Sequence, residues 1–179
     1  MSIPLQARSG AWQPALELLE PISLVRCCTS PLGRNLCMIV TETAVHVYAT
    51  SDESPNLSFE PVTSFFLGCR ATGASWSPST QHASTAWRIE ILVATETNEL
   101  RLLESVRQGS EASTSNKKLA DTYARVTDLA WCASPGYESY AAAACSDGTV
   151  RLWDLEGGCR THYLNSAVLS VAFHPKAVS

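Results

Sequence analysis

The sequence has no long apolar run and little charge. None of its 179 residues lies in a stretch that approaches the roughly 18 consecutive apolar residues of a membrane-spanning helix. The N-terminus holds no apolar segment behind a basic start, so a secretory signal peptide is not expected. Charged residues make up 17% of the chain, against roughly 25% in an average soluble domain. So small a share indicates that part of the surface is covered by another molecule.

Basic clusters are missing as well. The net charge is −4, and Lys117-Lys118 is the only adjacent basic pair. Binding to nucleic acid or to a membrane surface needs a concentrated basic patch, so neither is expected. The pair follows residues 107–116, a stretch rich in Ser, Gly, Glu and Thr, which predicts a flexible, solvated loop.

The cysteines show no metal-binding spacing. Cys159 and His162 stand close together, but a zinc site needs a second such pair at a matching interval. Cys27 and Cys28 are adjacent, so on a strand they face opposite sides. Most of the seven thiols stand among apolar neighbours, which predicts buried, reduced cysteines in an intracellular protein. We therefore expect no metal and no cofactor.

Motifs of catalysis are also absent. The sequence has no nucleophile elbow, no phosphate-binding loop and no paired catalytic carboxylates. The enzyme alternative is a Cys–His nucleophilic pair, which would need a thiolate beside a base and an oxyanion hole. We expect a protein without enzyme activity.

The strongest pattern that is present lies at residues 141–154. Two strand-like runs flank Asp147-Gly148, a pair that supplies the positive φ angles of a type I′ hairpin turn. Four alanines at 141–144 favour a helix by propensity alone, but the turn behind them favours a strand. Weaker copies of this hairpin occur at residues 37–48 and 91–104.

A second element repeats in step with the hairpins. Short apolar segments that end in an aromatic residue occur at 74–78, 129–132 and 171–175, and residues 24–31 are a degenerate first copy. Their aromatic residues are separated by 55 and then 42 residues. The order of strand, hairpin and connector therefore occurs about three times and begins a fourth, which is typical of a repeat fold. The polar stretch 79–88 interrupts the repeat. Residues 1–20 do not match the repeat, although 14–20 can form one helical turn.

The hairpin at 141–154 resembles a WD repeat, the four-stranded blade of a β-propeller. The resemblance implies a structural network of Asp147, Thr149 and Trp153 inside one blade, with Trp153 hydrogen-bonded toward Asp147. In WD repeats this network also contains a serine or threonine and a histidine. Here Cys145 stands at the serine position and Thr122 at about the histidine position, so the network is at best half present.

The order of the segments is similar to the N-terminal half of one family, the small single-propeller WD-repeat nucleoporins of the Y-shaped scaffold complex of the nuclear pore. That resemblance covers roughly residues 20–176 and rests on generic WD motifs. It implies a nuclear-envelope scaffold that docks onto a large propeller-plus-solenoid nucleoporin and supports transport of protein and mRNA. The alternative is another intracellular WD-repeat adaptor, either a ubiquitin-ligase substrate receptor or a chromatin-associated scaffold.

We therefore predict an all-β chain made of blades of an incomplete propeller. The predicted divisions are a non-repeat segment at 1–20, blades at 21–66, 67–122 and 123–165, and the start of a fourth blade at 166–179. A ring of about seven blades needs roughly 300 residues at this repeat length. The expectation is thus a fragment, a shortened product or half of an assembly, which by itself self-associates.

Overall fold

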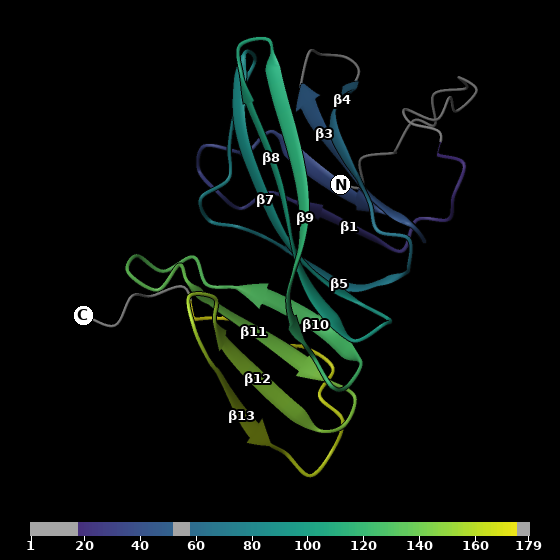
Figure 1. Cartoon of the computed structure of the whole chain (residues 1–179), viewed down its shortest axis with the longest axis vertical. Helices are drawn as coiled ribbons and strands as arrows, with labels where there is room; N and C mark the ends of the chain where they lie inside the picture. The colour runs from purple at the N-terminus through teal and green to yellow at the C-terminus, as the bar shows by residue number, and fades with distance from the viewer. Residues whose placement is uncertain (1–17, 52–57, 175–179) are drawn as a thin grey trace, which may run out of the picture.

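Every regular element in the described part of the chain is a β-strand. The structure is a computed structural model, and it describes residues 18–51 and 58–174. The strands of these residues form three separate antiparallel sheets, as Figure 1 shows. The chain is therefore all-β, with four-stranded blades of an incomplete WD-type propeller, as predicted. Of the predicted helical turn at 14–20, residues 14–17 lie outside the described part.

The first sheet is a meander of four neighbouring strands. Leu36–Val40 and Ala44–Ser51 pair as the hairpin that the sequence predicted, and its turn closes when Thr41 N donates to Ala44 O at 2.9 Å. The sheet contains, in order, β1 (Leu24–Cys27), β2 (Leu36–Val40), β3 (Ala44–Ser51) and β4 (Ser58–Phe66).

The second sheet has longer strands and one additional strand. The main path is β5 (Ala71–Trp76), β7 (Ala86–Thr95), β8 (Glu99–Gln108) and β9 (Glu111–Asp121), and the short β6 (Gln81–Ala83) pairs with β7. Figure 1 shows β7, β8 and β9 rising together to one tip of the molecule. The polar stretch 79–88 is thus partly strand, because it adds β6 and the start of β7.

The predicted flexible loop at 107–116 is wrong. These residues end β8, form a tight turn and begin β9, with Gln108 opposite Glu111 and Gly109 at a φ of 63°. Lys117 and Lys118, expected in the same loop, lie in β9. Backbone hydrogen bonds join the end of β8 to β7 and to β9, and this pairing does not need an apolar face, so the polar composition did not reveal the strand.

The third sheet carries the WD-like hairpin. Its order is β10 (Val126–Trp131), β11 (Tyr140–Cys145), β12 (Thr149–Asp154) and β13 (Cys159–Tyr163). The four alanines lie in β11, which confirms the strand prediction over their helix propensity. Gly148 has a φ of 83°, a conformation that favours glycine, but the φ of Asp147 is not positive, so the predicted type I′ turn is wrong.

The segment after the third sheet differs from the prediction. Residues 171–175 were expected as the first strand of a fourth blade, but the described residues 164–174 contain no strand. They lie against the third sheet instead, where Val168 N donates to Cys145 O at 3.2 Å. A strand needs a neighbouring strand to pair with, and none of the described residues supplies one beside this segment.

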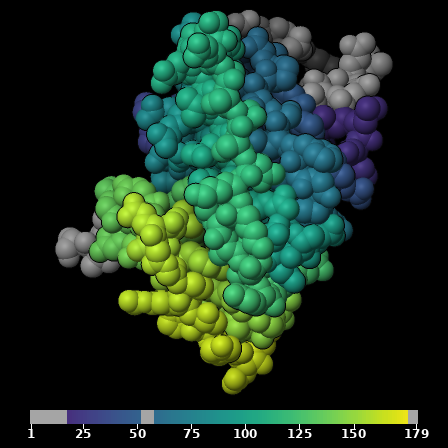
Figure 2. Space-filling view, in the orientation of Figure 1, coloured from purple at the N-terminus to yellow at the C-terminus, as the bar shows by residue number. Residues whose placement is uncertain are grey.

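Two cores join the three sheets. The first lies between the first and second sheets and is built from bulky aliphatic side chains such as Met38, Val45, Ile89 and Ile91. The second lies between the second and third sheets and contains Trp153 among several small residues. Figure 2 shows the green second sheet bordering the yellow-green third sheet in the lower half of the view. Within the described ranges, no helix is long and apolar enough to cross a membrane.

Candidate functional site

The predicted network begins at the turn between β11 and β12. Oδ1 of Asp147 accepts hydrogen bonds from the backbone N of Thr149 at 3.0 Å and from its Oγ1 at 2.6 Å. The side-chain hydrogen bond from Thr149 is the main cause that lowers the pKa of Asp147 below its usual value. This is the local pattern of an aspartate that fixes a turn two residues on.

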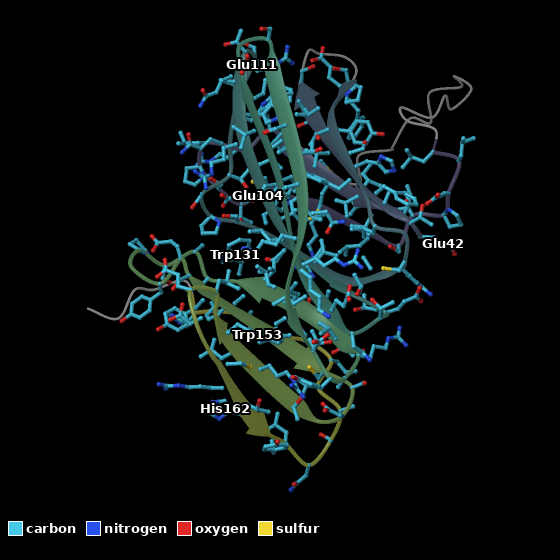
Figure 3. All side chains as sticks on the ribbon, in the orientation of Figure 1. Glu42, Glu104, Glu111, Trp131, Trp153 and His162 are labelled. Atoms are coloured by element: carbon cyan, nitrogen blue, oxygen red, sulfur yellow. The ribbon has the colours of Figure 1, made fainter. Side chains whose placement is uncertain are left out.

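Trp153 does not join this network by a hydrogen bond. It lies on β12, as Figure 3 shows, and is 5% exposed in the second core. Among the described residues no hydrogen bond links its indole to Asp147. Thr149 and Trp153 share one face of β12 but lie about 13 Å apart along it at the rise of a strand, so the indole is out of reach.

Arg151 lies between Thr149 and Trp153 on β12. Its Nη2 lies 3.8 Å from Asp147 Oδ2, and its guanidinium carbon lies 5.5 Å from the centre of the Tyr123 ring. The network of this turn therefore extends from Asp147 and Thr149 to Arg151. The sequence analysis missed Arg151, although the alternation of a strand places it on the same face as Thr149 and Trp153.

The two substituted WD positions do not rebuild the missing network. Thr122 is fully buried and donates to Ala124 O at 2.9 Å, so its hydroxyl serves its own loop. Cys145 is fully buried, and burial raises the pKa of its thiol, although Thr149 and Arg151 oppose the shift. The turn is thus a structural feature of one blade, without the histidine relay of a complete WD repeat.

The first strands of the three sheets, β1, β5 and β10, lie next to one another and are linked by polar contacts. Arg26 Nη2 of β1 lies 2.7 Å from Asp128 Oδ1 of β10, and Trp76 Nε1 of β5 donates to Arg26 O at 3.0 Å. Asp128 Oδ2 also accepts from Ser170 Oγ at 2.9 Å and Val171 N at 3.1 Å. Burial opposes ionisation of Asp128, yet the bonds from Val171, Ser170 and Arg26 together lower its pKa.

A small cavity of about 240 Å³ lies at the ends of these strands. Two exposed arginines, Arg70 and Arg125, occupy matching positions before β5 and β10 at its rim. Arg70 O accepts from Glu96 N and Arg125 O accepts from Ser146 N, both at 2.9 Å. The repeat therefore places a cation at the same point of two neighbouring blades.

A cluster that the sequence analysis missed lies between the first and second sheets. Arg107 stands 4.8 Å from the centre of the Trp87 ring, and the His82 ring lies 6.1 Å from it. Trp87 Nε1 donates to Ser105 Oγ at 3.1 Å, and Asn35 Nδ2 lies 3.0 Å from His82 Nδ1. Burial lowers the pKa of His82. The pairing of β7 with β8 places Trp87 opposite Arg107, and β6, which the polar composition concealed, adds His82.

The cysteines and histidines that drew attention in the sequence lie apart or at the surface. Cys159 is exposed, and Figure 3 shows His162 on the same edge strand, β13. Cys27 is exposed while Cys28 is buried, in accord with opposite faces. All seven cysteines are free, and no group of three or more potential ligands in the described residues could hold a metal ion.

Comparison with known proteins finds partial similarity to two kinds of protein, and no protein-family model matches the chain. Nucleoporin Nup37 of Mus musculus is 29% identical over 121 residues, which cover 67% of this chain and 36% of the nucleoporin. Two Danio rerio proteins, activating molecule in BECN1-regulated autophagy protein 1B and 1A, are 43% and 45% identical over 51 residues. Those matches cover 26% of this chain and 4% of each zebrafish protein. The chain thus spans little more than a third of the nucleoporin's length.

Proposed function

We propose that this chain is a WD-repeat protein-interaction module and that it acts as a scaffold component of the nuclear pore. Its partner would be a large propeller-plus-solenoid nucleoporin of the Y-shaped complex, and its role would be to support transport of protein and mRNA. The observation that carries the proposal is the similarity to a nucleoporin over 67% of a chain whose strands form successive antiparallel sheets of four or five strands. The division into blades at 21–66, 67–122, 123–165 and 166–179 is part of the proposal.

The thiols support a binding role over a catalytic one. A nucleophilic cysteine needs a lowered pKa, which cationic or helix-terminal surroundings provide. Burial instead raises the pKa of Cys28 and Cys145, and it raises that of Cys37 to about 11. We therefore propose a protein without enzyme activity, metal or cofactor.

Affinity purification from the native cell tests the nuclear-pore role. The full chain would carry a small tag, and co-purified proteins would be identified by mass spectrometry, with an untagged culture as control. Enrichment of several Y-complex nucleoporins together is the expected result. Recovery of none of them, with the chain distributed away from the nuclear rim by microscopy, would contradict the proposal.

A second candidate function is that of another intracellular adaptor. The zebrafish proteins are more identical than the nucleoporin, although over a shorter segment, and their names tie them to regulation of autophagy. The same purification separates the candidates, since an adaptor would bring down ubiquitin-ligase subunits, chromatin proteins or autophagy regulators in place of nucleoporins.

A further inference from the structure

A groove of about 500 Å³ runs between the second and third sheets. The end of β9 and the loop after it form one wall, and β12 with the turn that follows forms the other. Its apolar surface comes from Trp153 together with Leu100, Leu119 and Leu155. Three independent features of this groove point to a ligand.

The first feature is a buried donor without an acceptor. Nε of Arg151 is shielded from solvent and has no hydrogen-bond partner, the only such side-chain atom among the described residues. The Arg151 side chain is 13% exposed and has one distant ion pair, at 3.8 Å to Asp147. A buried N–H without a partner is unfavourable, so the Arg151 side chain is incompletely satisfied at the wall of the groove.

The second feature is Tyr123, which lines the groove from the loop after β9. Its φ is 57°, in the left-handed region that a bulky side chain rarely adopts, and its side chain is 80% exposed. The matching turn before β5 has Gly68 at a φ of 71°, so the turn of the repeat sets this conformation and the unusual feature is an aromatic side chain where the other blade has glycine. Backbone strain of this kind is concentrated at binding sites, and here it holds the ring beside Arg151.

The third feature is the negative charge at the end of β12 and in the turn that follows it. Asp154 and Glu156 line the groove, and neither forms an ion pair with a cation in the described ranges. Asp121 lines it too but is paired with Lys118 at 2.7 Å. The open end of the groove therefore presents uncompensated negative charge next to an apolar floor.

We propose that this groove binds an extended peptide segment of a protein partner, with an apolar side chain next to lysine or arginine. The apolar side chain packs on Trp153 and Leu119, a peptide carbonyl accepts a hydrogen bond from the guanidinium of Arg151, which lines the groove, and the basic side chain pairs with Asp154 and Glu156. Apolar anchors with polar groups that fix orientation are the usual composition of such sites. The proposal rests on the proposed role as an interaction module and names the surface that it uses.

Selection from a phage library of random twelve-residue peptides against the full chain tests the groove. Enriched peptides would be synthesised with a fluorescein label, and their dissociation constants measured by anisotropy. The expected consensus joins Leu, Ile or Phe to Lys or Arg. Glu156→Lys should weaken binding at least tenfold, whereas Glu111→Lys, the same charge change on exposed β9, should leave it within twofold.

Tyr123→Gly separates a binding role from a structural one. Glycine relieves the positive φ, so the denaturation midpoint should not fall, while peptide affinity falls at least fivefold. The groove is disproved if selection enriches nothing, enriches acidic peptides, or yields peptides that bind both groove variants as well as the parent chain.

The outcome stays distinct from that of the nuclear-pore proposal. Peptide selection uses no cellular partner, so selected groove ligands without co-purified nucleoporins would overturn the cellular role alone. Nucleoporins that co-purify equally with the parent chain and the Glu156→Lys variant would overturn the groove alone.

Discussion

The two cores that join the sheets achieve burial in different ways. In the first core, the bulk is spread over Leu36, Met38, Ile89, Ile91 and their neighbours, each almost fully buried. In the second core, β11 contributes only small residues, and Trp153 packs in the same cluster as the fully buried Leu92, Leu100 and Leu129. Both cores contain a buried indole, since Trp76 belongs to the first, but Trp153 lies opposite Ala141 of the alanine-rich strand. The second core therefore depends on Trp153 to fill the space beside β11.

The largest effect that would test this comparison is Trp153→Ala. Truncation should lower the free energy of unfolding by about 3–5 kcal/mol, because small neighbours cannot collapse into the space left by an indole. In the first core Ile91→Val should cost only about 0.5–1.5 kcal/mol. Urea denaturation followed by circular dichroism measures both values.

His162→Ala is the matched control, since this residue lies exposed on the neighbouring strand β13. It should change the free energy of unfolding by less than about 0.5 kcal/mol, as surface substitutions usually do. A loss below about 1 kcal/mol for Trp153→Ala would contradict a core that depends on one residue.

A smaller effect is expected from adding volume to each core. Ala143 is fully buried in the second core, so Ala143→Leu should cost about 1–3 kcal/mol through displaced neighbours. Met38→Leu in the first core conserves volume and should cost less than about 1.5 kcal/mol. If Ala143→Leu stabilised the chain, the small residues would line a void and the second core would not be tightly packed.

The hairpins of both cores were predictable from the sequence because local chemistry determines them. Asp147-Gly148 is a strong turn signal, although only Gly148 has a positive φ, and the apolar runs beside it must be buried. That consistency overrode the helix propensity of the alanines. The hairpin of β8 and β9 was not predictable in its outer part, since residues 107–116 carry no apolar alternation and are held by backbone pairing.

The site was less predictable than the fold. Asp147 and Thr149 form the expected turn contact, yet the groove depends on Arg151 of β12 and Tyr123 of the loop between β9 and β10. Their proximity follows from how this loop packs against the third sheet, and neither spacing nor composition reports that arrangement. The alternation along β12 was the one available signal, because it places Arg151 beside Trp153.

A backbone change in the third sheet should have a smaller effect again. Gly148 has a φ of 83°, and a Cβ there would stand 2.8 Å from Leu164 O. Gly148→Ala should therefore lower the free energy of unfolding by more than about 1 kcal/mol, beyond the gain from restricting the unfolded chain. Gly157→Ala is the control, since its Cβ would meet nothing within 4 Å and its φ is ordinary. Equal free energies of unfolding for the two variants would show that the turn accommodates the added Cβ without a loss of stability.

The smallest effect concerns a polar contact between the first and third sheets that is not part of either core. Asp128 of β10 meets Arg26 of β1, and the pKa of Asp128 is lowered in the folded chain. A lowered folded pKa means that the ionised carboxylate stabilises the fold above its unfolded pKa of about 3.9 and that this contribution is lost as pH falls through the folded value. Because Arg26 is 38% exposed, solvent screening limits the contribution to about 1 kcal/mol or less.

Asp128→Asn should thus be less stable than the parent chain at pH 7, and this deficit should become smaller at pH 2, because the parent carboxylate loses its contribution as it is protonated. Urea midpoints at both pH values measure the difference, with Glu111→Gln, an exposed change on β9, as the control that shows none. A deficit that is the same at both pH values would mean that the asparagine disturbs packing and that charge does not link the first sheet to the third. A deficit confined to high pH, together with the large loss for Trp153→Ala, would show that the third sheet is held mainly by one buried indole and only weakly by the carboxylate.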